Sequence, residues 1–254
     1  MNTAVEQQVV EAVRDFVARE VCPQVQRLEA AGEYPQHLVD AMAELGLFGI
    51  LVPEEHGGLG LRLEVVVQVF EALASGWTTL AGYLGSHCSV VHLVARHGTD
   101  AQRRRYLPEL ASGRCRGALC LTEPGAGSDL AAIRTSAQAQ ADGGTLLLNG
   151  TKLFVTNGAR ASLYAVLARA DPKAARPKDG ISLLLVERES PGVERGVTYA
   201  KMAFPHVDTV EVRFNDALVS TDAVLGGRQG AGLRQLLDAL EGGRAAIAAS
   251  AVGL

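Results

Sequence analysis

The sequence predicts an α+β protein with an all-α N-terminal domain (residues 1–115), a middle antiparallel β domain (116–217) and the first helix of a C-terminal helical domain (218–254). Three observations support this prediction. Apolar residues recur at helical spacing in the first segment. In the second, short runs of Val, Leu, Ile and Thr alternate with Gly, Asn, Asp and Pro, as strands and turns do. In the third, helical spacing returns from about Gly230 and the last residues stay apolar.

Glycines and capping residues divide the first segment into helices. Gly46 should end the second of them, and Thr99 or Asp100 can cap the last, which should end near Ser112. One stretch is apolar on all sides and should form a buried central helix. The expected helices lie at residues 5–17, 38–45, 61–74, 77–96 (the central one) and 100–112.

The middle segment contains two Asn-Gly pairs, each of which favours a tight turn. Asn149-Gly150 lies between two apolar runs and predicts a type I′ hairpin turn. Asn157-Gly158 should end the second of these strands in the same way. Between residues 170 and 180, two prolines and five charged residues indicate an exposed loop.

Length and composition argue against several classes of protein. The chain has 254 residues, of which 48% are hydrophobic and 20% charged, so it is globular and can bury a core in two domains. The net charge of −4 and the single basic run at residues 103–105 argue against nucleic-acid binding. No apolar run is judged long enough for a membrane span, and residues 1–8 lack a signal core. A cytoplasmic location is therefore expected.

No metal site is expected from the cysteines and histidines. The four cysteines form no C-x-x-C pair, which is typical of reduced thiols in a cytosolic protein. Three histidines recur at every fifth residue, and this spacing scatters them around a helix. The residues are Cys22, Cys88, Cys115 and Cys120, and His87, His92 and His97.

The most informative segment is Thr122-Glu123-Pro124-Gly125-Ala126-Gly127-Ser128-Asp129, which follows an apolar run. Two glycines at i and i+2 allow a tight turn in which several N–H groups point at one anion. The hydroxyls of Thr122 and Ser128 add further donors and acceptors. These groups suit a phosphate linked to a polar ring, although a plain Pro-Gly-x-Gly turn between strands has the same pattern.

Together with residues 146–158, this loop resembles the flavin site of the acyl-CoA dehydrogenase family. That family's middle domain carries a TEPGAGSD-type loop followed by an NG-x-K-x-W-I-T-NG hairpin, and the eight-residue match makes the resemblance specific. Alone, the second segment would be an ordinary hairpin. Further matches cover residues 179–187, 191–193, 225–233 and 241–249. The resemblance implies a barrel-like middle domain and a C-terminal bundle that is cut short at Leu254.

The resemblance implies an FAD-dependent oxidoreductase that introduces an α,β double bond into an acyl thioester, with hydride transfer to flavin N5. Leu121 and Thr122 would bond the pyrimidine side of the flavin, and Thr156 would lie near N5. The full set of implied cofactor contacts is Leu119, Leu121, Thr122, Gly127, Ser128, Phe154, Val155 and Thr156. The implied substrate contacts are Ser128, Glu241 and Arg244. A simple intrahelical ion pair is the alternative for the last two.

The sequence also departs from the family pattern. Phe154 replaces the usual Trp, which keeps an aromatic wall but loses the indole N–H. Residues 201–209 lack the Gly, Arg and Ser of a K-x-G-x-R-x-S-x-T pattern, so no acyl-group preference can be carried over. The catalytic base is unknown. The family's usual glutamate is expected beyond Leu254, and Gly243 occupies the alternative position.

Two other functions stay open. The chain could be a non-catalytic or half-site subunit of a hetero-oligomeric acyl-CoA dehydrogenase, or a flavin oxidase or monooxygenase on the same scaffold. As partners, the resemblance implies an acyl thioester of coenzyme A or of an acyl carrier protein, and an electron-transfer flavoprotein. It also implies a homo-oligomer (tetramer or dimer), or a hetero-oligomer with a related subunit.

Overall fold

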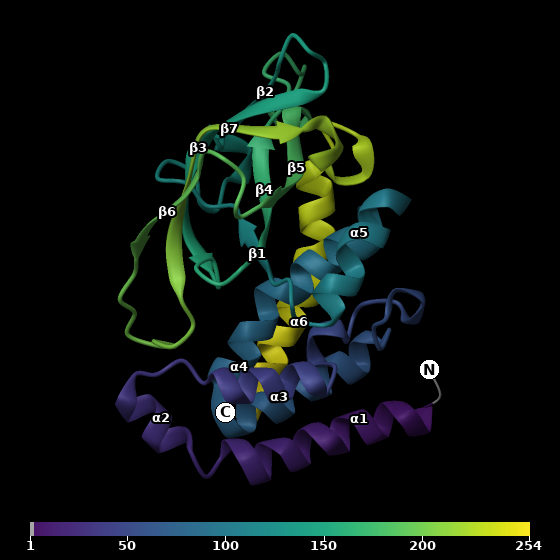
Figure 1. Ribbon diagram of the computed structural model, residues 1–254, viewed down its shortest axis with the longest axis vertical. Helices are drawn as coiled ribbons and strands as arrows, with labels where there is room; N and C mark the ends of the chain where they lie inside the picture. The colour runs from purple at the N-terminus through teal and green to yellow at the C-terminus, as the bar shows by residue number, and fades with distance from the viewer. Residues whose placement is uncertain (1–2) are drawn as a thin grey trace.

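A computed structural model describes residues 3–254, with helices at one end and a curled sheet at the other (Figure 1). Met1 and Asn2 lie outside the described residues. They begin the segment 1–8, in which no signal core was expected. The helices are α1 (Thr3–Phe16), α2 (Val25–Ala31), α3 (Gln36–Glu44), α4 (Leu63–His97), α5 (Asp100–Ala111) and α6 (Gly232–Gly253). The strands are β1 (Gly117–Cys120), β2 (Ser136–Ala139), β3 (Thr145–Thr156), β4 (Leu163–Arg169), β5 (Ile181–Glu187), β6 (Val193–Thr198) and β7 (Thr209–Ser220).

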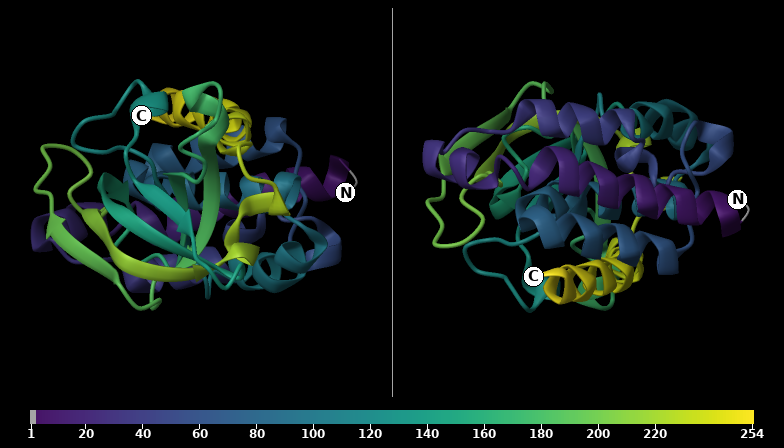
Figure 2. Two further views of the ribbon diagram at one scale, coloured as in Figure 1. Left: turned by 90° about the horizontal axis from the view of Figure 1, so that it is seen from above. Right: turned by 90° about the horizontal axis from the view of Figure 1, so that it is seen from below.

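The N-terminal domain is organised around α4. This helix leaves helical geometry at Trp77 (φ −158°, ψ 105°), which separates the two helices that the sequence predicts at 61–74 and 77–96. By length and composition alone α4 could cross a membrane, which the sequence analysis did not expect. However, 61% of its most apolar stretch is buried inside the protein, as in the core helix of a globular domain. α6 lies along this same helix (Figure 2).

The start of α5 confirms Thr99 as its cap. The Thr99 hydroxyl accepts a hydrogen bond from the Gln102 backbone N–H (3.2 Å), and the Gln102 side chain accepts one from the Thr99 N–H (3.0 Å). This reciprocal pair satisfies two backbone donors that the helix itself leaves without partners. The Gln102 amide also donates to the carbonyl groups of Asp222 (2.8 Å) and Val224 (2.9 Å). This capping residue therefore joins the helical domain to the segment that follows β7.

The β domain is one curled sheet with the order β1-β4-β2-β3-β7-β6, and β5 pairs with the other edge of β4. The pairs β2·β3, β3·β7, β4·β5 and β6·β7 are antiparallel, as expected. β1 and β2 instead pair with β4 in parallel, so the expectation of an antiparallel sheet is wrong for these two pairs. From β1 the chain passes through the 122–129 loop, β2 and β3 before it enters β4, which gives it the long connections that parallel pairing needs. The last strand ends at Ser220, three residues after the expected boundary.

The predicted hairpin turn at Asn149-Gly150 is wrong. β3 runs without interruption from Thr145 to Thr156. At this Asn-Gly pair its pairing with β7 shows a bulge, between Leu148 and Gly150, and a second register shift follows between Lys152 and Val155. The Asn149 side chain bonds Asp216 of β7 twice, accepting from its N–H and donating to its carboxylate, each at 2.9 Å. Because these bonds hold the two strands together, the Asn-Gly pair kinks β3 and does not reverse it.

The turn predicted at Asn157-Gly158 is confirmed. Asn157 has a positive φ of 59°, which asparagine tolerates better than most residues, and β3 ends just before it. Its side-chain amide donates to the α4 carbonyl groups of Gly82 (3.1 Å) and Tyr83 (3.2 Å). This turn therefore fixes the end of β3 against the central helix.

Candidate functional site

A buried ion pair anchors the loop at residues 122–129. Glu123 in the loop is 7% exposed, Lys152 on β3 is 0% exposed, and Lys152 Nζ lies 2.8 Å from Glu123 Oε1. The backbone N–H groups of Arg134 (2.6 Å) and Thr135 (3.0 Å) donate to the same carboxylate. Lys152 also donates to the carbonyl of Leu121 at 3.0 Å. The two segments that carry the family resemblance are thus physically joined.

The surroundings of Glu123 favour its ionised form. Burial raises the pKa of this carboxyl group. The hydrogen bonds from Lys152, Thr135 and Arg134 outweigh burial and hold the pKa below its ordinary value of 4.5. At neutral pH the loop is therefore anchored by a charge-assisted contact inside the protein.

Beyond this anchor, the loop presents backbone donors to open space. The N–H of Glu123 bonds the carbonyl of Ala126 (2.8 Å) and the N–H of Ala126 bonds the carbonyl of Glu123 (3.2 Å), which closes a turn. Gly127 and Ser128 follow and are exposed, and their N–H groups have no hydrogen-bond partner among residues 3–254. A Cβ added at Gly125 or Gly127 would meet no atom within 4 Å.

Neither Gly125 nor Gly127 has a positive φ, so these glycines are not needed for the tight turn that the sequence analysis invoked. Their lack of a side chain instead leaves the loop's N–H groups open to a ligand. Free, accessible backbone N–H groups of this kind can bind an anionic group such as a diphosphate.

The end of β3 lies beside this loop. The N–H of Leu153 donates to the carbonyl of Thr122 at 2.8 Å. Phe154 has a φ of 57° and is 57% exposed, with its ring 4.8 Å from that of Tyr199. A positive φ is rare for an aromatic residue and costs of order 1–3 kcal/mol, so the surrounding strands hold Phe154 in this conformation. The ring is directed outward, where it can cover a ligand.

The other predicted cofactor contacts differ in accessibility. Leu119, Leu121, Thr122 and Thr156 are partly exposed and can contact a ligand. Val155 is 1% exposed and its side chain packs in the core of the sheet. Only the backbone of Val155 can therefore take the role that the resemblance implies.

α4 reaches the end of β3, and α6 packs against α4. The Ser86 hydroxyl of α4 donates to the carbonyl of Thr156 at 3.4 Å. One turn further along α4, Ser89 lies against α6, where a Cβ added at Gly243 would lie 3.6 Å from its hydroxyl oxygen. Gly243 thus lies on the side of α6 that faces α4, whereas Glu241 and Arg244 are exposed. The alternative of an ion pair between these two finds no support, because no such contact exists in the structure of residues 3–254.

Glu123 and Lys152 were not among the site residues predicted from the sequence. The signal was available, because Lys152 occupies an inward position of β3, where alternate residues such as Leu146 and Leu148 are buried. A charged side chain at such a position requires a buried partner. The nearest glutamate in the matching loop is Glu123.

The histidines correct another expectation. His87 turns inward, where its Nε2 lies 2.9 Å from the Phe48 carbonyl and its Nδ1 accepts from the Gly117 N–H at 3.2 Å. His92 and His97, expected to be scattered, both contact Asp238 of α6. Both histidines reach the same carboxylate because α6 lies along α4 and places Asp238 between them.

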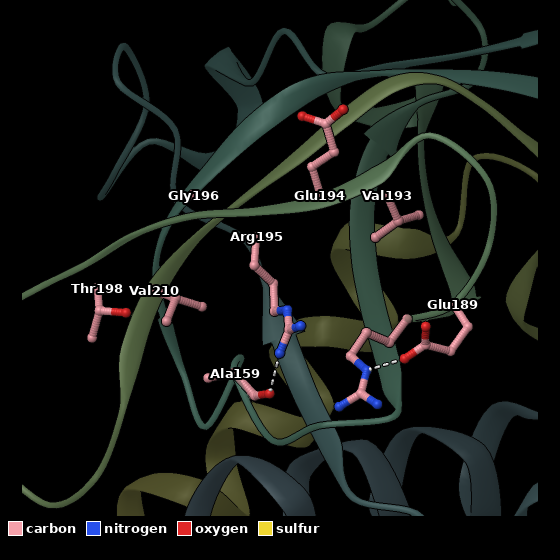
Figure 3. Close-up of a pocket in the computed structure, with 9 residues that line it drawn as sticks. Ala159, Glu189, Val193, Glu194, Arg195, Gly196, Thr198 and Val210 are labelled. Carbon is pink, nitrogen blue, oxygen red and sulfur yellow. Dashed lines mark hydrogen bonds and ion pairs between the residues drawn. The ribbon is translucent and has the colours of Figure 1, made fainter.

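A cleft of about 590 Å³ between β6 and the turns that carry Ala159 and Glu189 lies apart from these groups (Figure 3). None of the predicted cofactor contacts lines it. Its two arginines are already engaged, Arg195 with the Ala159 carbonyl (2.9 Å) and Arg188 with Glu189 (2.6 Å). The cleft therefore offers no free pair of cations for an anionic ligand.

Two family models match the chain, the acyl-CoA dehydrogenase N-terminal domain at residues 3–114 and the acyl-CoA dehydrogenase middle domain at residues 118–217. The chain belongs to the acyl-CoA dehydrogenase family. The second match contains both segments of the site described above.

Other members of the family match this chain in sequence or structure along most of its length. The long-chain specific acyl-CoA dehydrogenase of Sus scrofa is 36% identical over 95% of the chain and 56% of that relative. Butyryl-CoA dehydrogenase from Megasphaera elsdenii superposes with a TM-score of 0.92 at 32% identity, over 100% of this chain and 66% of that one. A Bacillus anthracis acyl-CoA dehydrogenase in complex with FAD superposes with a TM-score of 0.87 at 31% identity, over 99% and 42%. The chain thus spans between about two fifths and two thirds of these proteins.

Proposed function

We propose that this protein is an FAD-dependent oxidoreductase that introduces an α,β double bond into an acyl thioester. The observation that carries this proposal is the loop at residues 122–129. It is anchored by Glu123 and Lys152, and it presents the free N–H groups of Gly127 and Ser128 beside the end of β3. Family membership adds the reaction class. A bound flavin would supply the hydride acceptor.

Each residue near the loop has a role in this proposal. Gly127 and Ser128 bind the cofactor diphosphate through their backbone N–H groups. Leu121 and Thr122, at the end of β1, bind the polar edge of the ring and favour negative charge there. Phe154 covers the ring and excludes water, and the Thr156 hydroxyl orients its reactive side. Ser128 also reaches the arm of the acyl carrier.

Replacing Gly127 with Ala should weaken FAD binding about tenfold or more, because a methyl group would occupy the space that the diphosphate needs. Stability should change by less than about 0.5 kcal/mol, since the added Cβ meets no atom within 4 Å. Gly144→Ala is the matched control, because its Cβ also meets no atom and it lies in a distant turn. Fluorescence titration with FAD and urea unfolding measure the two effects. Equal FAD affinity in both variants would contradict the assignment.

Gly243 favours a second candidate, a subunit that binds flavin and acyl carrier while a related partner supplies the base. α6 places this residue beside Ser89, and a glycine there has no side chain with which to remove a proton. Glu241, the nearest carboxylate on α6, is exposed and turned to another face of the helix.

Anaerobic spectroscopy of the gene product that carries this sequence separates the two candidates. Bleaching of bound flavin by an acyl-CoA supports the dehydrogenase. Flavin binding without bleaching supports the half-site subunit, and bleaching only in Gly243→Glu would locate the missing base. A gene product that binds no flavin contradicts both. Oxygen consumption in place of transfer to an external acceptor would indicate an oxidase or monooxygenase.

We also propose an acyl carrier, an electron acceptor, a location and an assembly for this protein. The acyl group is carried by coenzyme A or by an acyl carrier protein, and electrons pass to an electron-transfer flavoprotein. The protein acts in the cytoplasm as a homo-oligomer, or as a hetero-oligomer with a related subunit. Size-exclusion chromatography with light scattering of the gene product tests the assembly.

A further inference from the structure

Three metal-ligating side chains meet where α4 ends against α6. His92 and His97 come from the last turns of α4, and Asp238 comes from α6. Asp238 Oδ2 lies 3.3 Å from Nε2 of His92 and 2.8 Å from Nε2 of His97. All three ligand atoms lie within 4.8 Å of one another. Both imidazoles therefore present the same nitrogen to one carboxylate oxygen.

The two contacts of Asp238 are close to the ligand spacing of a first-row metal centre. Zinc binds histidine nitrogen and carboxylate oxygen at about 2.0–2.2 Å in a tetrahedron, which separates neighbouring ligand atoms by about 3.3 Å. The contact between His92 and Asp238 already has this separation of 3.3 Å. The contact between His97 and Asp238 at 2.8 Å needs to open by only about 0.5 Å, within the reach of side-chain rotation.

The charge and access of the cluster also suit a divalent cation. Asp238 supplies one carboxylate ligand to the cluster, and an ordinary aspartate is ionised at neutral pH. Among residues 3–254, no lysine or arginine forms an ion pair with it. The side chains of His92, His97 and Asp238 are 33%, 23% and 39% exposed, so an ion can enter and keep a water ligand.

Gln235, also on α6, has a buried side-chain oxygen without a hydrogen-bond partner among residues 3–254. Gln235 precedes Asp238 by one helical turn and so lies on the same side of α6. It is 8% exposed, and its Oε1 has no hydrogen-bond partner among residues 3–254. Its amide nitrogen and the His97 carbonyl both border Gly226. The turn of α6 that precedes Asp238 therefore carries a buried acceptor without a donor.

We propose that His92, His97 and Asp238 form a binding site for a divalent transition-metal ion of the zinc type, which clips α6 onto the end of α4. The ion replaces the hydrogen bonds between the imidazoles and the carboxylate, and each imidazole binds it through Nε2. The site is separate from the 122–129 loop and does not depend on the proposed oxidoreductase function.

Zinc and cobalt binding to the purified chain tests this site. After treatment with EDTA, equilibrium dialysis should show one zinc per chain, and Co²⁺ should give the visible bands of a tetrahedral site. Excess zinc at about 100 times its Kd should raise the melting temperature by roughly 5–10 °C. His97→Gln and Asp238→Asn should each weaken binding about 100-fold or more.

His37→Gln is the matched control, because His37 lies on α3 and bonds Gln24 away from the cluster. Circular dichroism in EDTA verifies that each variant is folded. No zinc bound by the unmodified chain would overturn the proposal, as would equal binding by His97→Gln or Asp238→Asn. Zinc-dependent dimerisation in sedimentation velocity would also overturn it, because the ion would then link two chains.

Discussion

Lys152→Met should lower the free energy of unfolding by about 3–5 kcal/mol, because it leaves the Glu123 carboxylate buried without its cation. The flavin site should weaken as well. The loop at residues 122–129 would lose the bond that Lys152 makes to the Leu121 carbonyl along with the ion pair. Urea unfolding measures the first effect, and FAD titration of the folded variant measures the second.

A surface ion pair provides the control for this prediction. Arg105 pairs with Glu187, and both side chains are at least half exposed. Arg105→Met should therefore change stability by less than about 1 kcal/mol. In the double variant Glu123→Gln/Lys152→Met, the loss should be smaller than the sum of the single losses by about 1–3 kcal/mol. Additive losses would show that the two side chains are not energetically coupled.

Acid should destabilise the protein through His87. Burial lowers the pKa of this histidine from 6.5 to about 4, against the hydrogen bond to Phe48. Between these two values the unfolded chain binds a proton that the folded chain does not. Stability is therefore complete above about pH 6.5 and falls as the pH drops toward 4. The pKa difference corresponds to a loss of about 3 kcal/mol.

Urea unfolding at intervals from pH 4 to 7 measures this slope, and His87→Gln is the comparison. Glutamine keeps one donor and one acceptor for Phe48 and Gly117 but does not titrate. The variant should lose the His87 part of the slope, while acidic groups such as Glu123 still contribute below about pH 4.5. The same slope in both proteins would show that His87 is not the group responsible.

The sequence was sufficient to predict the division into a helical segment, a β segment and a returning helix, and the position of the loop of the candidate site, because these depend on local spacing and on turn residues. The cap at Thr99 and the turn at Asn157 were predicted for this reason. Asn149-Gly150 was misinterpreted, since its turn preference is overruled by bonds to Asp216, 67 residues away in the chain. The His92 and His97 cluster was missed similarly, because Asp238 reaches it only through the packing of two distant helices.

The bonds of Gln102 have a consequence for how the chain folds. Its side chain also accepts a hydrogen bond from the Gly226 N–H at 3.0 Å, so one amide contacts residues that lie 120–124 positions later in the chain. Contacts of such long range form late, after much of the chain has been ordered. The capping residue of α5 therefore gains these partners only once the segment that follows β7 has packed against it. A chain cut after residue 115 would keep the cap at Thr99 but leave a side chain without the partners that satisfy it.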